Sequence, residues 1–596
     1  MNHSSQSKLD VLRSAMQASG VQACIIPSTD PHISEYTPER WKTRQWISGF
    51  TGSAGTIVVT NNQAGLWTDS RYFLQAEEQL QGSGIALFKA GLPETPSPEE
   101  WLKNELKAGD TVGLDGAVFA ASDVLRWIDD WKNSNIRIDT CFAPYDTIWK
   151  DRPPLPAHPA FVHPETFSGE SARSKIDRLL IAMQEQNCQS TLLASLDAIA
   201  WMLNLRGNDI EYNPVTISYL FVSEKETVLF ISPQKLTPEV TAHLQSAKVV
   251  CAQYEKIYTY TQRLEPQRIW ITPSKINYAL YRSIPENCTL HETAVHPVDA
   301  MKAVKNETEI AGIRRAMQRD GVALVKCFHW LDTQLEENKT VTELDISHSL
   351  KKKRSEQAYF YSESFETIAA YGPHGAIVHY AATEAGNATL RPEGLLLIDS
   401  GAQYLDGTTD ITRTLALGPV SDAMKQDFTR LLKGNISLAT AQFPRGTVGM
   451  QLDVLARQFL WQEAQNYLHG TGHGVGHFLN VHEGPQSIRM NYNPAPLEPG
   501  MVTSNEPGIY RTGRYGVRIE NLLLAVPGTT SEWGEFYRFE TLTLCPIDTR
   551  LIDLSLLTEP EREWLNAYHQ KVYQLLAPDL SDEERNWLKQ KTGIYL

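Results

Sequence analysis

The sequence predicts a mixed fold, in which two α/β blocks precede a larger α+β block. Up to about residue 298, helical patterns alternate with short apolar runs typical of strands. From about residue 300, long helices and β-hairpins replace that alternation. A proline-rich stretch at 151–164 without periodicity is typical of a linker. We therefore predict three domains, at 1–155, 156–299 and 300–596.

The first two blocks contain the same series of a hairpin followed by a helix, which suggests two related small domains. In the first, we expect a helix at 8–18, strands at 23–28, 56–60 and 64–69, a helix at 71–80 and a strand at 111–116. In the second, we expect a helix at 171–186, a hairpin at 218–232 and a helix at 237–244.

The third block begins with one long apolar stripe that predicts a helix starting near Glu307. The stripe residues recur at helical spacing and are Ile310, Ile313, Met317, Leu324, Phe328 and Leu331. Further helices are expected around 342–357, 422–442 and 449–466, with strands and two hairpins among them.

Composition excludes several functional classes. The 55 Lys+Arg and 70 Asp+Glu residues give a net charge of −15, and no basic run is longer than the KKKR at 351–354. Nucleic acid is therefore not an expected partner, because phosphate binding needs clustered positive charge. Seven scattered cysteines without a CxxC pair predict free thiols in the cytoplasm. The polar N-terminus and the lack of a long apolar run predict neither a signal peptide nor a membrane span.

Residues 395–417 read as a hairpin that brings two aspartates together. Asp399 ends one apolar run, Asp410 begins the next, and Asp406-Gly407 supplies the turn. The two carboxylates can lie side by side across the strands. On this segment alone, ordinary turn-capping aspartates are the favoured interpretation.

A second hairpin at 503–526 weakens that interpretation. It contains Glu506 beside Pro507-Gly508, and it places Glu520 next to the apolar run at 522–524. A carboxylate in a buried strand needs a partner, because an unpaired buried charge costs several kcal/mol. Arg518, two residues away on the same face, is one candidate partner for Glu520, and a metal ion is the other.

Four of the 16 histidines fall within the 14 residues 469–482. The i,i+4 spacing of His469 and His473 resembles a helical zinc motif, but the intervening glycines oppose a helix, so we expect an extended segment. In a strand, His469, His473 and His477 share one face, and any of them could enter a site. A glycine-spaced cluster of this kind favours a metal or acid–base centre.

The candidate ligands are four carboxylates and one imidazole, with no thiolate. This set suits manganese, cobalt or zinc and disfavours copper(I) and structural zinc. Four carboxylates are too many for one catalytic ion but natural for two ions that share carboxylates and a water. Such a pair lowers the pKa of the shared water, so the predicted chemistry is hydrolysis.

These residues resemble the pita-bread metallopeptidases, and within them the three-domain Xaa-Pro aminopeptidases. The resemblance covers almost the whole chain and rests on several segments, which are SGFTGSAGT, LWTDSRYFLQAEEQL, AWMLNLRGNDIEYNPV, GPHGAIVHYA, IDSGAQYLDGTTDITRT, HGTGHGVGHFLNVHEGP, NEPGIY and RIENLLL. It implies two creatinase-like N-terminal α/β domains followed by a pita-bread catalytic domain.

The resemblance also assigns roles. It implies that the metal ligands are Asp399, Asp410, His473, Glu506 and Glu520, and that they hold two divalent ions, with Mn²⁺ expected and Zn²⁺ or Co²⁺ as alternatives. Asp399 would hold one ion, His473 and Glu506 the other, and Asp410 and Glu520 both. The implied catalytic residues are Glu506, His379, His469 and His482, and the implied substrate-binding residues are those three histidines with Tyr510 and Arg518.

The expected reaction is hydrolysis of the N-terminal Xaa-Pro bond of a peptide by a hydroxide shared between the two ions. The proline nitrogen of this tertiary amide carries no proton, so it must be protonated as it leaves, a role implied for Glu506. Prolidase shares the ligands but cleaves dipeptides and is usually a two-domain chain. A non-catalytic binding module and the metal-free creatinases are disfavoured, because no ligand is missing here.

Two departures from the resemblance concern the neighbours of the ligands. His477 stands where close relatives have a small polar residue, and Ser504-Asn505 precedes Glu506 where an aspartate is common in eukaryotic relatives. We expect His477 to lie near the site without being a ligand. The family is usually homodimeric, which makes a second copy of the chain the expected partner beside the peptide substrate.

Overall fold

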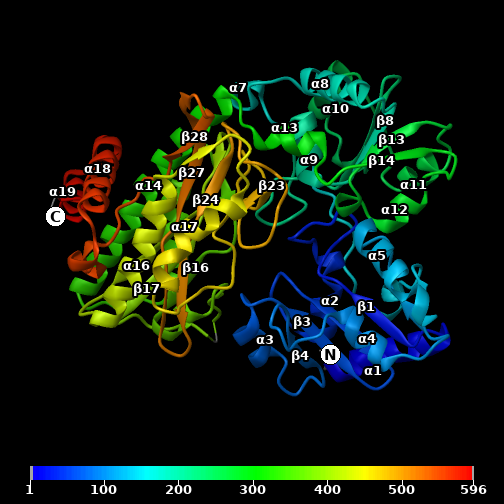
Figure 1. The fold of residues 1–596 in the computed structure, drawn as a ribbon, viewed down its shortest axis with the longest axis horizontal. Helices are drawn as coiled ribbons and strands as arrows, with labels where there is room; N and C mark the ends of the chain where they lie inside the picture. The colour runs from blue at the N-terminus through cyan, green and yellow to red at the C-terminus, as the bar shows by residue number, and fades with distance from the viewer. Residues whose placement is uncertain (1–4, 385, 594–596) are drawn as a thin grey trace. The chain divides into compact units, whose positions relative to one another are not determined.

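The computed structural model describes residues 5–384 and 386–593, which form two compact units. The first unit contains the chain up to His163 together with Glu170–Val298, and the second contains Pro164–Gly169 and the chain from Asp299 onward. Figure 1 shows their helices and strands along the chain.

The first half of the first unit is a six-stranded mixed sheet with helices on it. The strand order is β4-β3-β2-β1-β5-β6. The strands are β1 (Ala23–Ile26), β2 (Thr56–Thr60), β3 (Ala64–Thr68), β4 (Ala86–Lys89), β5 (Thr111–Gly113) and β6 (Arg137–Asp139). The helices are α1 (Ser5–Ala18), α2 (Thr43–Ser48), α3 (Phe73–Gln79), α4 (Pro98–Glu105), α5 (Ala121–Trp131) and α6 (Tyr145–Ile148).

The second half of this unit repeats the same sheet. Its order is β12-β11-β10-β8-β13-β14, and each strand pair has the same direction, parallel or antiparallel, as its counterpart in the first sheet. The strands are β8 (Ser190–Leu193), β10 (Ser218–Ser223), β11 (Thr227–Ile231), β12 (Val249–Ala252), β13 (Arg268–Ile271) and β14 (Thr289–Glu292), with β7 (Phe161–Val162) paired to β9 (Leu205–Arg206) outside the sheet. The helices are α8 (Ala172–Glu185), α9 (Leu196–Leu203), α10 (Pro238–Ser246), α11 (Lys256–Thr261) and α12 (Tyr278–Arg282). The expected relationship between the two blocks is therefore visible in their topology.

The second unit packs long helices against curved antiparallel sheets. A six-stranded sheet has the order β21-β28-β27-β24-β22-β23, and smaller sheets have the orders β16-β17-β20, β15-β18-β19 and β25-β26. The strands are β15 (Phe360–Glu363), β16 (Ile368–Tyr371), β17 (Leu395–Ser400), β18 (Ala402–Tyr404), β19 (Gly407–Thr408), β20 (Ile411–Ala416), β21 (Gln442–Pro444), β22 (Gly472–Gly474), β23 (Glu483–Ile488), β24 (Val502–Asn505), β25 (Gly508–Arg511), β26 (Tyr515–Arg518), β27 (Asn521–Ser531) and β28 (Gly534–Thr541).

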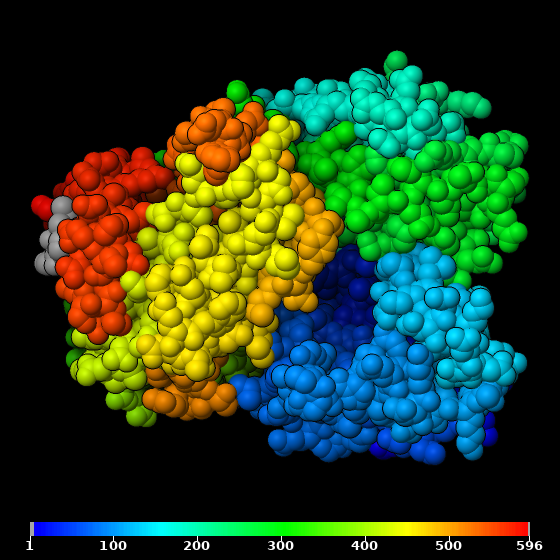
Figure 2. All heavy atoms as spheres, viewed as in Figure 1, coloured from blue at the N-terminus to red at the C-terminus, as the bar shows by residue number. Residues whose placement is uncertain are grey.

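The helices of the second unit include the long one that the sequence predicts at Glu307. Helix α14 (Glu307–Glu336) begins where a capping box forms, because Asn306 and Glu309 each bond the other's backbone N–H. The other helices are α7 (Glu165–Ser168), α13 (Pro297–Ala303), α15 (Glu343–Ser355), α16 (Asp422–Ala439), α17 (Gly449–Trp461), α18 (Glu559–Leu576) and α19 (Asp582–Lys591). The yellow helices α16 and α17 form much of the visible face of this unit in Figure 2.

Buried apolar residues from α14, α16, β26 and α18 form a large core in the second unit, and the strands that carry the candidate ligands lie next to it. Among the described residues, no helix is both long and apolar enough to cross a membrane.

Candidate metal centre

The first pair of predicted carboxylates lies where two neighbouring strands meet. Strands β17 and β20 pair antiparallel, with Asp399 opposite Thr412, and Asp410 directly precedes β20. The predicted hairpin is confirmed, although its middle forms a smaller pair, β18 and β19. Both aspartates are buried, at 9% and 4% exposure. Turn capping therefore does not explain either of them.

The second pair of predicted carboxylates, Glu506 and Glu520, lies where the strand pairing of the second hairpin is interrupted. Strand β24 pairs with β27 so that Asn505 faces Asn521, and the intervening segment folds separately as β25 and β26. Glu506 and Glu520 stand just outside the paired residues, so the expectation of Glu520 within a continuous strand was wrong. The Glu520 N–H instead donates to the Thr412 carbonyl at 3.1 Å. The break brings this carboxylate next to Asp410.

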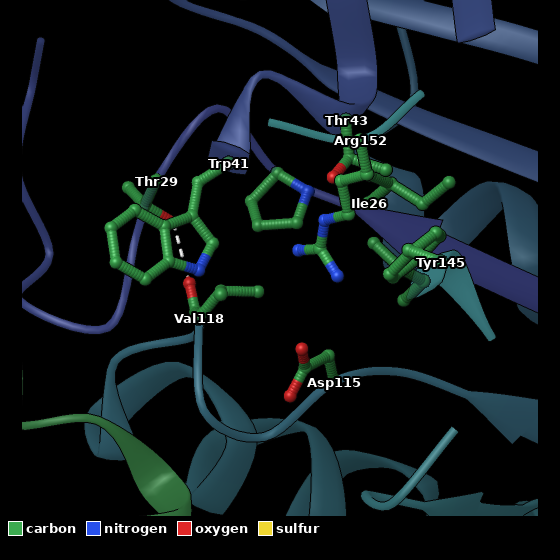
Figure 3. A pocket seen from close by; sticks show the side chains of 10 residues that line it. Ile26, Thr29, Trp41, Thr43, Asp115, Val118, Tyr145 and Arg152 are labelled. Atoms are coloured by element: carbon green, nitrogen blue, oxygen red, sulfur yellow. Dashed lines mark hydrogen bonds between the residues drawn. The ribbon is translucent and has the colours of Figure 1, made fainter. Parts of the chain in front are cut away.

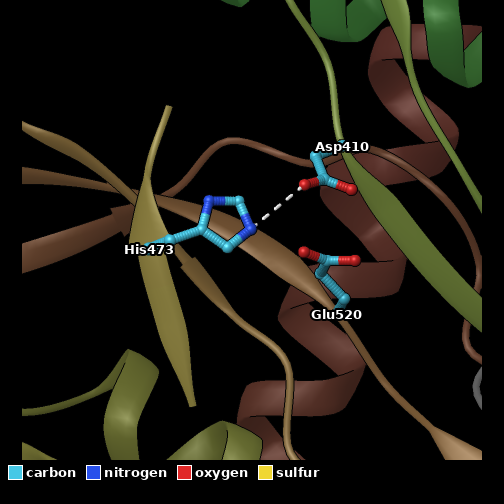
Figure 4. A group of neighbouring side chains, drawn as sticks. All are labelled: Asp410, His473 and Glu520. Carbon is cyan, nitrogen blue, oxygen red and sulfur yellow. Dashed lines mark ion pairs between the residues drawn. The ribbon is translucent and has the colours of Figure 1, made fainter. Parts of the chain in front are cut away.

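His473 is the histidine that enters this group. It lies in β22, with Nε2 at 3.5 Å from Asp410 Oδ2 and 3.3 Å from Glu506 Oε1. Its Nδ1 is 3.0 Å from the Gly474 carbonyl, so Nδ1 donates its proton there and Nε2 is the ring nitrogen turned toward the carboxylates. Figure 4 shows His473, Asp410 and Glu520 pointing toward one another. Ligand atoms of these three residues all lie within 4.8 Å of one another.

The glycines around His473 permit this approach of strands. A Cβ at Gly472 would lie 1.9 Å from the Ser504 carbonyl oxygen, so no other residue fits between β22 and β24. The expected extended conformation of the histidine segment is limited to Gly472–Gly474. The common face predicted for His469, His473 and His477 does not form.

The electrostatics of the cluster fit divalent cations. Burial and the neighbouring carboxylates raise the pKa of Asp410 and of Glu520 well above their usual range. Burial raises the pKa of Glu506 to about 7, with a smaller contribution from Asp399. Asp399 Oδ1 is buried and has no hydrogen-bond partner among the described residues. An oxygen-rich group with an unused buried carboxylate oxygen is the donor set that hard divalent ions require.

Arg518 pairs with a different carboxylate from the one expected. Its Nη2 lies 2.6 Å from Asp399 Oδ2, and its Nη1 donates to the Tyr510 hydroxyl at 2.7 Å. The Tyr510 hydroxyl is 2.8 Å from His469 Nε2, and burial raises its pKa to about 12. The ion pair considered between Arg518 and Glu520 is therefore absent from the ion pairs of the described residues. The described neighbours of the Glu520 carboxylate are the Thr412 hydroxyl, Asp410 and His473.

The remaining predicted histidines lie in three surroundings. The His482 ring packs against that of His473, with centroids 4.4 Å apart and planes at 80°. His379 is half-buried and follows Val378, whose carbonyl accepts from Arg518 at 3.4 Å. His477 is buried, and a Cβ at Gly312 of α14 would lie 3.2 Å from its Nε2, so His477 faces that helix.

Sequence reasoning missed several groups that hold the candidate site residues in place. The Thr412 hydroxyl donates to Glu520 Oε2 at 2.9 Å and accepts from Arg518 Nε at 3.2 Å. On α17, Arg457 donates to the His469 carbonyl at 2.8 Å and pairs with Asp453 at 2.6 Å. The i,i+4 spacing of Asp453 and Arg457 was a possible signal, but sequence cannot tell a buried pair from an exposed one.

The first unit contains a pocket whose lining differs from that of the candidate metal centre. It is lined by Ile25, Ile26, Pro27, Thr29, Trp41, Thr43, Asp115, Val118, Tyr145 and Arg152. In Figure 3 the Thr29 hydroxyl bonds the Val118 carbonyl across one side of it. Asp115 is the only carboxylate in the lining, and there is no histidine, so the pocket lacks the donors of a metal site.

Comparison with known proteins agrees with this geometry. Residues 8–140 and 151–309 each match a creatinase/prolidase N-terminal domain, residues 311–527 match metallopeptidase family M24, and residues 535–594 match the C-terminal region of that peptidase family. The chain is 41% identical to a probable Xaa-Pro aminopeptidase P of Coprinopsis cinerea, an alignment that covers 98% of this chain and 97% of that protein. The corresponding protein of Aspergillus flavus is 40% identical, over 98% of this chain and 92% of its own length.

A solved structure shares the whole fold. The X-prolyl aminopeptidase of Caenorhabditis elegans, described as a cytosolic enzyme with a di-nuclear active site, superimposes with a TM-score of 0.95 at 36% identity and covers 99% of both chains. The chain therefore belongs to metallopeptidase family M24 and, over nearly its whole length, to the Xaa-Pro aminopeptidase P group within it.

Proposed function

We propose that this protein is an aminopeptidase that hydrolyses the N-terminal Xaa-Pro bond of peptides. One observation carries the proposal: three buried carboxylates, the half-buried Glu506 and one imidazole, drawn from segments far apart in the sequence, lie close together in a chain whose relatives are named for this activity. Asp410, His473 and Glu520 provide the part of that group whose ligand atoms lie within 4.8 Å of one another.

The five residues would hold two divalent ions. Asp399 would serve one ion, His473 and Glu506 the other, and Asp410 and Glu520 both. Mn²⁺ is the proposed metal, with Zn²⁺ and Co²⁺ as alternatives of similar ligand preference. When bound, the two ions would supply a hydroxide nucleophile near neutral pH, because coordination lowers the pKa of a water shared between them.

Glu506 would move the proton that the reaction needs. Its Oε1 lies 3.3 Å from His473 Nε2 and accepts from the Ser504 hydroxyl at 3.1 Å, so the carboxylate is held at the edge of the ligand group. A leaving proline nitrogen must gain a proton before it departs. Glu506 is the carboxylate that can take a proton from the attacking water and deliver it to that nitrogen.

Tyr510, Arg518 and three histidines would bind the substrate. Tyr510 keeps its proton at neutral pH, because burial raises its pKa to about 12, and so its hydroxyl remains a donor. The His469 Nδ1 lies 2.8 Å from the Gly470 carbonyl, which leaves Nε2 as the acceptor of the Tyr510 hydroxyl. His379, His469 and His482 would then orient the substrate carbonyl and stabilise the charge that develops on it.

The test compares peptide substrates on metal-depleted and reloaded protein. We expect protein treated with a chelator to lose activity and regain it with Mn²⁺, and to cleave Arg-Pro-Pro. The variant Asp410→Ala should bind less metal and lose activity, whereas Glu532→Ala, an exposed carboxylate on the β27–β28 turn, should behave like the wild type. Activity confined to Gly-Pro would indicate a prolidase instead. A protein that gains neither metal nor activity would indicate a binding module.

We also propose that the protein is a cytoplasmic homodimer with three domains at 1–155, 156–299 and 300–596. The two sheets of equal topology support the domain division. The cytosolic description of the C. elegans relative and the absence of a disulfide among the described cysteines support the location. Exposed apolar side chains along α17, Met450, Val454 and Trp461, support a second copy of the chain as partner. Sedimentation analysis of the purified chain would measure its oligomeric state.

A further inference from the structure

A buried arginine connects the strands of the metal centre to the C-terminal region of the chain. Arg413 lies on β20 and is 2% exposed. Its neighbour Thr412 bonds the proposed ligand Glu520, whereas the Arg413 side chain is bonded to backbone and hydroxyl oxygens, several of them from residues 545–568. The guanidinium thus lies between the ligand strands and a part of the chain with no ligand in it.

The Arg413 guanidinium donates hydrogen bonds to several surrounding oxygen atoms, all of which are neutral. Its Nη1 donates to the carbonyls of Thr412 at 2.9 Å and of Glu520 at 2.6 Å. The other acceptors are Asn521 Oδ1 at 2.8 Å, the Cys545 carbonyl at 3.0 Å, the Tyr568 hydroxyl at 2.8 Å and the Pro546 carbonyl at 3.2 Å. Among the described residues, no carboxylate pairs with it. The arrangement is therefore better suited to fixing backbone positions than to neutralising a charge.

Tyr568 completes this arrangement from helix α18, the red helix behind Asp410 and Glu520 in Figure 4. Its hydroxyl accepts from Arg413 and from the Cys545 N–H at 3.3 Å, and it can donate to the Cys545 carbonyl at 2.9 Å or the Thr543 carbonyl at 3.1 Å. The Tyr568 ring stacks on Trp564, with centroids 5.3 Å apart. One hydroxyl therefore connects α18, the 543–546 segment and Arg413.

Arg413 holds the backbone at Glu520, and the position of that backbone determines whether the Glu520 carboxylate can bind metal. Glu520 lies outside any strand ladder, in the break between β26 and β27, so regular pairing does not position it. Its carbonyl is held by Arg413 and its N–H by the Thr412 carbonyl. The side chain of the next residue, Asn521, is also held by Arg413.

We propose that Arg413 and Tyr568 are positioning residues for the metal centre, through which the C-terminal region fixes the backbone at Glu520 and so sets the affinity for metal. The proposal rests on the proposed function of Glu520 as a ligand. Groups that orient ligands in this way typically change metal affinity 10- to 100-fold when they are removed.

The first test uses Tyr568→Phe in the full chain. This variant keeps the ring and its stacking but removes the hydroxyl, and we expect it to bind Mn²⁺ at least about 10-fold more weakly in calorimetric titration. Activity should return toward the wild-type kcat at saturating Mn²⁺. The matched control is Tyr573→Phe on the same helix, whose hydroxyl makes no hydrogen bond to the described part of the chain, and it should bind Mn²⁺ as the wild type does. Equal affinity in Tyr568→Phe and Tyr573→Phe would overturn the proposal.

The second test uses the wild-type protein and does not depend on the folding of a variant. Coupling between two sites is reciprocal, so Mn²⁺ should slow amide hydrogen exchange in 543–547 and α18 as well as near the ligands. Protection confined to the ligand strands would overturn the proposal. The proposed function and this inference can fail separately. A wild type that binds no metal would refute the proposed function. A wild type that binds two ions, together with a Tyr568→Phe variant of equal metal affinity, would refute only this inference.

Discussion

Replacing Asp410 with asparagine should stabilise the metal-free protein while it weakens metal binding. Ligand oxygens of Asp410 and Glu520 lie within 4.8 Å of each other in a buried site. Two full charges at 4.8 Å repel by about 3.5 kcal/mol at an effective dielectric constant of about 20. Burial and the neighbouring carboxylates raise the pKa of both groups, so the site disfavours two charges together. Because the substitution removes one of these charges, we expect it to relieve part of this repulsion at pH 8, about 1–2 kcal/mol.

The assay is denaturant-induced unfolding at pH 8, with EDTA or with excess Mn²⁺. In EDTA, Asp410→Asn should exceed the wild type in free energy of unfolding. With Mn²⁺ the order should reverse, because the wild type gains about 2.7 kcal/mol at a free ion concentration 100 times its Kd and the variant gains less. A variant less stable than the wild type in EDTA would refute the electrostatic reasoning.

The matched control makes the same chemical change at a buried carboxylate that has a cationic partner. Asp427 on α16 accepts from Arg511 at 2.7 and 2.9 Å and from the Tyr515 hydroxyl at 2.9 Å. Asp427→Asn removes the charge opposite Arg511, so it should destabilise the protein both with and without metal.

Two further predictions concern a buried histidine and a close backbone contact. His296 accepts a hydrogen bond from the Val298 N–H through Nδ1 and bonds Thr191 through Nε2. Burial lowers its pKa from 6.5 to about 3. Between pH 3 and pH 6.5 this histidine is therefore protonated in the unfolded chain but not in the folded one. As the pH falls from 6.5 to 3, the free energy of unfolding of the wild type should therefore decrease by about 1.4 kcal/mol per pH unit relative to that of His296→Gln. The measurement is the slope of the free energy of unfolding against pH for both proteins. Parallel slopes would contradict this prediction. A Cβ at Gly516 would lie 1.7 Å from the Gly375 carbonyl oxygen, so Gly516→Ala should separate β26 from the loop before His379, raise KM in peptide kinetics and destabilise the protein by about 1–3 kcal/mol. Unchanged kinetics would show that this loop does not position substrate.

The secondary structure was predictable wherever apolar residues recur at a regular spacing along the sequence. The stripe from Ile310 to Leu331 predicted a helix that starts near Glu307, and α14 begins at that residue. The 449–466 helix ends instead at Trp461, because the following residues turn to carry His469 toward the site. Helices α18 and α19 were not predicted, and α18 carries Tyr568, whose hydroxyl bonds Arg413.

The structure brings Asp410, His473 and Glu520 together as the sequence predicts, but the pairing of side chains within the site was not predictable. Residue types and turn signals identified Asp399, Asp410 and the two glutamates as candidate metal ligands, because buried carboxylates need partners. Spacing along a strand made Arg518 one of two candidate partners for Glu520, but the strand ends at Arg518, which pairs with Asp399 instead. Such a break depends on contacts from distant segments, which a local pattern does not contain.

The break at Glu520 also has a consequence for how the protein matures. Its N–H and carbonyl are held by residues 412 and 413, and the arginine is in turn held by a tyrosine near the end of the chain. Local helices and hairpins can form early, but closing these long loops comes late and slowly. During refolding, the capacity to hold metal should therefore appear after most of the secondary structure has formed.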